Sequence, residues 1–176
     1  MQKIILGLDP GTQAVGFATV ALEKNQIRVL GHGVMVPDHP QNQVPERLFE
    51  LGETFEQIMK TYKPDVVVIE KSFFHKNADT AFKLGQSRGV FMYVARKFHA
   101  EIAEYATRAV KKTVTGQGDA DKLMVERALK SLLGVKSFAT HDASDALALA
   151  YHHVVEIKKQ QLISRAVDIG SKGQGL

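Results

Sequence analysis

Four acidic residues stand apart from the rest because each adjoins an apolar segment. Asp9 and Glu70 each close a run of apolar residues that is typical of a buried strand. Asp142 and Asp145 open an alanine-rich stretch, and their spacing of three places both side chains on one face of a helix. A carboxylate beside a dry core is unstable unless another group compensates its charge. We therefore expect these side chains to meet around a cation.

Carboxylate oxygens are hard ligands, and Mg²⁺ combines them with the phosphate oxygens of a substrate. Two such ions about 3.5–4 Å apart can hold the attacking and leaving oxygens of a phosphoryl displacement. The pattern therefore predicts metal-dependent phosphoryl chemistry. A simpler interpretation also exists for each residue alone. An Asp before Pro-Gly forms turns, a Glu after a strand is often its first exposed residue, and an Asp at a helix start stabilises the helix dipole.

The elements that must position these residues follow from apolar periodicity. Strands are expected over 3–8, 14–22, 27–36, 65–69 and 107–110. Helices are expected over 46–59, 78–98, 119–133 and 142–163, with Asp119 as an N-cap and Gly134 as a stop. The segment 65–69 is apolar on both faces and so should be central, whereas two glycines mark 27–36 as an edge or bulged strand.

This order of elements predicts an α/β fold with a mixed five-stranded sheet and helices on both faces. The first three strands, joined by short turns, form an antiparallel meander, and the last two are added in parallel. One domain is expected over 1–163, followed by a disordered tail over 164–176 that has three glycines and no periodicity.

Composition excludes several classes of protein. The chain has 176 residues and no cysteine, which rules out disulfides, a thiolate zinc site and a cysteine nucleophile. No apolar run approaches the roughly 20 residues needed to span a bilayer, and the strand-like start of the chain does not look like a signal peptide. We expect a cytoplasmic protein with no membrane association.

The positive charge is concentrated in the middle of the chain. Residues 71–130 contain 12 basic and 6 acidic residues, whereas residues 1–70 contain 6 basic and 9 acidic ones. A basic region suggests a polyanionic partner such as nucleic acid. The alternative is a pair of solvated, lysine-rich helices.

Several motifs together resemble RuvC-type Holliday junction resolvases. They occur in the family's order from about residue 4 to 153, and so cover nearly the whole chain. They are GLDPGT at 7–12 with GF at 16–17, VIEKSFF at 68–74 leading into KNAD at 76–79, LGQSRG at 84–89, VKKTVTG at 110–116 with ADK at 120–122, and HDASDALA at 141–148.

The resemblance implies a ribonuclease-H-like fold and a homodimer whose main contact is the long helix after Glu70. It implies a structure-selective DNA endonuclease that resolves four-way junctions in recombination and repair. Paired nicks of strands of like polarity would leave 5′-phosphate and 3′-hydroxyl ends. The implied cofactor is Mg²⁺, with Mn²⁺ as a substitute and two ions per site, and the implied partners are the branch-migration proteins RuvA and RuvB.

The family's catalytic, metal-binding carboxylates match Asp9, Glu70, Asp142 and Asp145. Some members carry a histidine in place of the first Asp of the final pair, so His141 is an alternative ligand, although the Asp-x-x-Asp spacing favours Asp142. The family's basic residues near the cleaved phosphate match Lys111 and Lys122, which are expected to act in catalysis.

An aromatic side chain that opens the junction matches Phe73, because an exposed ring can stack on an unpaired base. The neighbouring ring is the other candidate for this role. Basic side chains nearby are expected to neutralise phosphates, which makes binding salt-dependent. The full set of expected DNA contacts is Phe73, Phe74, Lys76, Asn77, Lys83, Arg88, Lys111, Lys112 and Lys122.

Two other functions remain open from the sequence. The segment 9–12 also resembles the first phosphate motif of actin-like phosphotransferases or ATPases, although those enzymes use two such domains. A non-catalytic junction-binding protein is the other alternative, but such a protein gains nothing from acidic residues that face phosphate. ATP binding would favour the first alternative, and a nicking assay with Mg²⁺ separates all three functions.

Overall fold

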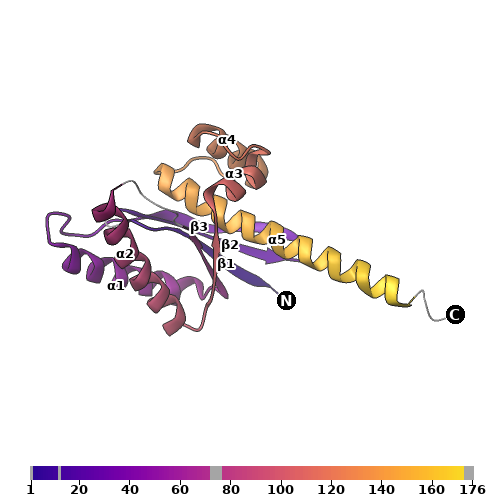
Figure 1. Cartoon of the computed structure of the whole chain (residues 1–176), viewed down its shortest axis with the longest axis horizontal. Coiled ribbons are helices and arrows are strands. Elements are labelled where there is room, and N and C mark those ends of the chain that lie inside the picture. The colour runs from indigo at the N-terminus through magenta and orange to yellow at the C-terminus, as the bar shows by residue number, and fades with distance from the viewer. Residues whose placement is uncertain (1, 12, 72–76, 173–176) are drawn as a thin grey trace.

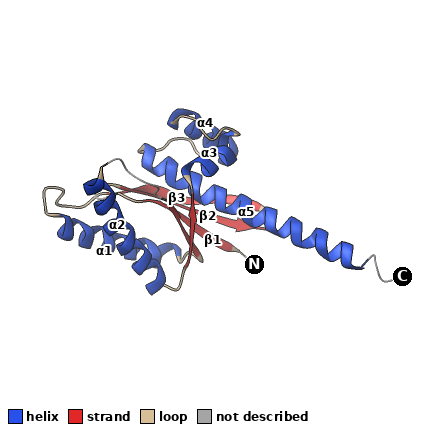
Figure 2. Ribbon diagram, in the orientation of Figure 1, coloured by secondary structure: helices blue, strands red, loops and turns tan. Residues whose placement is uncertain are grey.

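A sheet of five strands forms the centre of the computed structural model, which describes residues 2–11, 13–71 and 77–172. Helices cover both faces of this sheet (Figures 1 and 2). The strands are β1 (Lys3–Asp9), β2 (Val15–Glu23), β3 (Gln26–Met35), β4 (Val66–Glu70) and β5 (Glu101–Tyr105). The helices are α1 (Val44–Tyr62), α2 (Ala78–Lys97), α3 (Thr107–Thr115), α4 (Lys122–Leu133) and α5 (His141–Lys172).

The strand order is β3-β2-β1-β4-β5, with β1, β2 and β3 antiparallel and with β4 and β5 running parallel to β1. This arrangement confirms the predicted mixed sheet. The apolar strand β4 is central, as expected, and β3 lies at the edge. The pairing of β2 with β3 also contains an irregularity between Thr19 and Val20, so the glycine-containing strand takes part in a bulge.

Two apolar cores lie on opposite faces of the sheet because strand side chains alternate. On β1, Leu6 and Leu8 face the core shared with α1 and α2, whereas Ile5 faces the core shared with α3, α4 and α5. Figure 1 shows the same two layers, with α1 and α2 on one side of the sheet and α3, α4 and α5 on the other. Residues two and four positions after Ile5 therefore also face α5.

The backbone of α5 lies directly against β1 and β2. A Cβ atom placed on Gly7 would stand 2.0 Å from the carbonyl oxygen of Ala146, and one placed on Gly16 would stand 2.1 Å from that of Asp142. Only glycine fits at such separations, and the helix residues that face the sheet are small, such as the fully buried Ala143 and Ala146. This contact places the start of α5 beside the end of β1.

The fifth strand was predicted at the wrong place. It spans Glu101–Tyr105, and the segment expected to be a strand begins α3 instead. The β-branched residues of this segment favour a strand locally, but Val110 and Val114 are four residues apart and both are buried against α4 and α5. Burial of one helical face decides the structure here.

The start of α4 also differs from the expectation. Asp121, not Asp119, is the N-cap residue, and its carboxylate accepts the Met124 N–H at 2.7 Å. The helix ends as predicted at Gly134, which has a φ of 68° in the left-handed region that favours glycine.

The last helix is longer than expected. The sequence predicted that it would end at 163, but α5 continues to Lys172 and projects past the sheet (Figure 1). Residues 159–166 are exposed, so the helix continues there without packing. Strong helix formers such as Lys, Gln and Leu account for this. The segment 164–172 is therefore helical rather than a tail without secondary structure, and the domain limit at 163 stays a prediction.

The close contact of α5 with the sheet can be tested by Gly7→Ala. The added methyl group would meet the backbone of α5, so we expect the free energy of unfolding to fall by about 2 kcal/mol or more. Gly85→Ala is the matched control, because a Cβ there has no neighbour within 4 Å and Gly85 is exposed on α2. The control should be neutral or gain up to about 1 kcal/mol. Urea unfolding measures both, and equal stabilities would contradict the packing described.

Candidate active site

Strand register brings Asp9 and Glu70 together. Because Leu8 pairs with Ile69 in the parallel β1–β4 ladder, the next residue of each strand lies at the same edge of the sheet. Ile5 in β1 and Val68 in β4 both face the core on the α5 side of the sheet. Asp9 lies four residues after Ile5, and Glu70 lies two residues after Val68. Both carboxylates therefore face α5, as the strand alternation requires.

The other two acidic residues come from the first turn and a half of α5. Asp142 and Asp145 lie on the helix that Gly16 allows to approach the end of β1. Thr140 caps this helix, because its hydroxyl accepts the Ala143 N–H at 3.3 Å. The negative charge of the acids suits a helix N-terminus.

A pocket of about 280 Å³ lies between these elements, and we call it the acidic pocket. It collects side chains from β1, β4, α3, α4 and α5, so both the sheet and the helices on one of its faces contribute. The lining residues are Asp9, Glu70, Thr107, Val110, Lys111, Lys122, Val125, Asp145, Ala148 and Leu149.

The acidic pocket concentrates uncompensated negative charge on Asp9. Burial and, after it, repulsion from Glu70, Asp145 and Asp142 together raise the pKa of Asp9 from an ordinary 3.8 to about 7. Lys122 acts in the opposite direction and limits the rise. Asp142 does not line the pocket, but it is close enough to act on Asp9.

Lys122 is the cation closest to this charge. Its Nζ lies 3.2 Å from Oδ2 of Asp145 and comes from the first residue of α4. Burial acts to lower the pKa of Lys122, but the attraction of Asp145, Asp142 and Asp9 and the hydrogen bond to Asp145 together outweigh burial, so the pKa lies above its ordinary value. Lys122 therefore remains charged and faces the acids, as expected of a residue that meets a phosphate.

Glu70 is held from two sides by residues that the sequence did not single out for this role. The hydroxyl of Thr107 donates a hydrogen bond to Oε1 of Glu70. The guanidinium of Arg88 donates to the backbone carbonyl of Glu70 and pairs with Glu104 on β5. Thr107 was missed because its segment was expected to be a strand. No local sequence pattern marks Thr107, because its position beside Glu70 follows from the pairing of Tyr105 with Glu70 in the sheet.

The side chains at this site fit a hard divalent cation, because their ligand atoms are carboxylate oxygens and none is sulfur. A cation would also reduce the repulsion between Asp9 and the other acids. Over the ranges 2–11, 13–71 and 77–172, no three acidic or histidine side chains converge closely enough to surround one ion. Asp145 is instead paired with Lys122, and Glu70 is bonded to Thr107. The carboxylate oxygens are therefore suitable metal ligands, but in this structure Asp145 and Glu70 are bound to other side chains instead.

The alternative ligand His141 points elsewhere. Its Nδ1 lies 3.6 Å from Oε2 of Glu126 on α4. Neither His141 nor Asp142 lines the acidic pocket, but Asp142 is the one of the two that raises the pKa of Asp9. This difference favours Asp142 over His141 as the residue that acts with Asp9.

Among the described residues, some of the side chains expected to contact DNA already have intramolecular partners, and others do not. Asn77 caps α2 by accepting the N–H groups of Asp79 and Thr80, Lys83 lies 2.6 Å from Asp79, and Arg88 is bound to Glu70 and Glu104. Lys111 lines the acidic pocket and Lys112 is exposed beside it on α3. Phe73, Phe74 and Lys76 lie outside the described residues.

Comparison with known proteins gives one consistent result. A family model described as crossover junction endodeoxyribonuclease RuvC matches residues 5–153. The crossover junction endodeoxyribonuclease RuvC of Bdellovibrio bacteriovorus is 50% identical over 169 residues, covering 96% of this chain and 100% of that protein. The structure of Thermus thermophilus RuvC in complex with Holliday junction substrate superposes with a TM-score of 0.82 at 26% identity, covering 90% of this chain and 96% of that one.

The raised pKa of Asp9 makes stability depend on pH. Because the pKa is higher in the folded than in the unfolded protein, stability from this group is complete below about pH 4 and is lost as pH rises through about 7. Without divalent ions, Asp9→Asn should therefore be more stable than the parent chain. We expect its advantage to grow by roughly 2–3 kcal/mol between pH 5 and pH 8.

Urea unfolding in a chelating buffer measures this difference. Asp119→Asn, which removes an exposed carboxylate outside the pocket, is the matched control and should follow the parent chain at both pH values. An Asp9→Asn advantage that does not change with pH would show that Asp9 ionises normally.

Proposed function

Because this chain belongs to the RuvC family of crossover junction endodeoxyribonucleases, we propose that the acidic pocket is where it cleaves DNA. The chain is a structure-selective endonuclease that resolves four-way junctions in recombination and repair. The observation that carries the assignment of the site is the convergence of acids from β1, β4 and α5 on a pocket that also holds two lysines. No feature of the structure favours a phosphotransferase or a non-catalytic protein.

Asp9, Glu70, Asp142 and Asp145 are the residues that would hold the metal. We propose Mg²⁺, two ions per site, with Mn²⁺ as a substitute. Bound there, the ions supply positive charge against the phosphate and lower the pKa of a coordinated water. Support for this proposal comes from the all-oxygen donor set and from the electrostatic strain on Asp9.

The chain's own side chains position the scissile phosphate. Lys122 and Lys111 face the pocket and would neutralise the charge that develops on the phosphate oxygens. Thr107 holds one oxygen of Glu70 by a hydrogen bond. The apolar wall of Val110, Val125 and Leu149 lowers the local dielectric and strengthens each of these interactions. The products are 5′-phosphate and 3′-hydroxyl ends.

Paired nicking of strands of like polarity needs two such sites. We propose a homodimer that forms through α2 and the neighbouring part of α1. An apolar hollow of about 490 Å³ lies there, and Tyr93, which lines it, is 69% exposed. Exposed apolar surface of this kind marks interaction sites. Its other lining residues are Val44, Pro45, Leu48, Gln86, Gly89 and Val90.

The junction itself would be held by the segment after Glu70 and by α3. Phe73 is proposed to stack in the opened junction with Phe74 beside it, and Lys76 and Lys112 to contact phosphates. DNA contacts by Asn77, Lys83 and Arg88 stay predictions, because each of these side chains already has an intramolecular partner.

Action with RuvA and RuvB in the cytoplasm is proposed from family membership. No helix in the described ranges has the length and apolar character needed to cross a membrane.

Cleavage of a synthetic four-way junction tests this function. With Mg²⁺, the parent chain should introduce symmetric nicks, and Asp9→Asn should lose about 10³-fold or more in rate because the metal loses a ligand. Binding of the junction, measured by gel shift without Mg²⁺, should change by less than about 3-fold, since an acid that faces phosphate does not aid binding.

Asp119→Asn is again the control and should cleave like the parent chain. Retention of full cleavage by Asp9→Asn would contradict the site, and cleavage by the parent chain in a chelating buffer would contradict the metal.

A further inference from the structure

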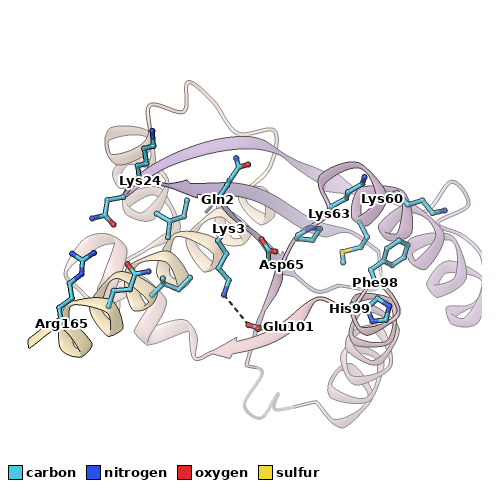
Figure 3. A pocket seen from close by; sticks show the side chains of 16 residues that line it. Gln2, Lys3, Lys24, Lys60, Lys63, Asp65, Phe98, His99, Glu101 and Arg165 are labelled. Carbon is cyan, nitrogen blue, oxygen red and sulfur yellow. Dashed lines mark ion pairs between the residues drawn. The ribbon is translucent and has the colours of Figure 1, made fainter. Parts of the chain in front are cut away.

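A much larger hollow lies at the opposite end of the sheet from the acidic pocket, and we call it the basic hollow (Figure 3). Its volume is about 1260 Å³. It is formed by the beginnings of β1, β4 and β5, the β2–β3 turn, the end of α1, the turn after α2, and the part of α5 that projects past the sheet. Segments from both layers of the fold therefore meet at this hollow.

Positive charge predominates around the basic hollow. Five of its lining residues are Lys or Arg, and Asp65 and Glu101 are the acidic ones. Both acids are already engaged, because Asp65 accepts the Ile4 N–H at 2.7 Å and Glu101 lies 3.8 Å from Lys3. The lining cations are Lys3, Lys24, Lys60, Lys63 and Arg165.

Three of these cations are unpaired. Within the described part of the chain, Lys24, Lys63 and Arg165 form no ion pair, while Lys60 makes only a 3.9 Å contact with Glu56. Lys24 follows β2 and Lys63 follows α1, whereas Arg165 belongs to α5. Figure 3 shows Lys24 and Arg165 on one side of the hollow and Lys60 and Lys63 on the other. The rim therefore offers positive charge from two sides.

Five apolar residues also line the basic hollow. Leu22, Met59 and Pro64 are buried, and the side chains of Phe98 and Ile157 are half-buried. A hollow whose lining combines apolar and charged side chains can contact an apolar side chain while its cations pair with opposite charges beside it.

We propose that the basic hollow binds an acidic segment of a partner protein, with one apolar side chain of that segment inserted between α5 and the end of α1. The charge of the rim and the apolar residues of the lining both match such a peptide. Double-stranded DNA matches the rim alone, because its surface presents phosphates and no apolar side chain.

The position of the basic hollow permits this partner and the DNA junction to bind together. Lys3 and Asp9 are the two ends of β1, and six residues of strand separate them by about 20 Å. A partner at the beginning of β1 therefore leaves the acidic pocket free. The proposal does not rest on the proposed cleavage site, because it concerns another surface.

The test uses the full chain and a fluorescein-labelled synthetic peptide of about twelve residues, with aspartates on both sides of one phenylalanine. Fluorescence anisotropy should show saturable binding that weakens as salt rises. The double variant Lys63→Glu/Arg165→Glu should bind the peptide about 10-fold or more weakly, because charge is reversed on both sides of the hollow. Cleavage of the four-way junction by this variant should be unchanged.

Arg127→Glu/Lys136→Glu is the matched control, because it alters net charge by the same amount at exposed positions outside the hollow. This control should bind the peptide within about 2-fold of the parent chain. A peptide with serine in place of phenylalanine should bind at least about 5-fold more weakly to the parent chain.

Four results would overturn the proposal. They are no binding of the peptide, an equal loss in the two double variants, equal binding of the serine peptide, and a loss of junction binding in Lys63→Glu/Arg165→Glu that exceeds its loss of peptide binding. The last result would identify the basic hollow as a DNA surface.

Discussion

The direct contact between the backbone of α5 and the sheet determines the rest of this structure. Gly7 and Gly16 remove the side chains that would hold α5 at an ordinary helix–sheet distance, and the alanines of α5 match them. The same contact fixes where the helix starts, so Asp142 and Asp145 lie close to the end of β1. The two glycines are therefore as important for the site as the acids are, although they carry no chemistry.

This packing creates an electrostatic problem that the fold alone does not solve. Asp9 is partly buried near three other acids, and its raised pKa reflects the unfavourable free energy of ionising it there. Lys122 offsets part of the charge through Asp145, and Thr107 holds Glu70. A local arrangement that costs stability is typical of functional sites, where a ligand supplies the missing interaction. This electrostatic cost is the reason for proposing a cation-dependent reaction at this end of the sheet.

The sequence predicted the parts of the site that depend on local pattern. Asp9 and Glu70 end apolar strands, and the two acids of α5 have helical spacing, so both pairs could be found without the tertiary structure. Thr107 could not, because its β-branched neighbours favour a strand and only packing against α4 and α5 makes the segment helical. The engagement of Arg88 with Glu70 also depends on a contact between segments distant in sequence. The antiparallel meander and the parallel additions were predictable from connection lengths and apolar runs, although the fifth strand was placed at the wrong residues.

The acids of this pocket are proposed to form one coupled group that a divalent cation completes. Because Asp9 has a pKa of about 7, Mn²⁺ must displace its proton on binding. Calorimetric titration of the DNA-free protein with Mn²⁺, in buffers of different ionisation heat, measures that proton directly. The account predicts release of about half a proton per site at pH 7, almost none at pH 9, and none from Asp9→Asn at either pH. Mn²⁺ binding to the parent chain without proton release at pH 7, or release that persists in Asp9→Asn, would contradict it.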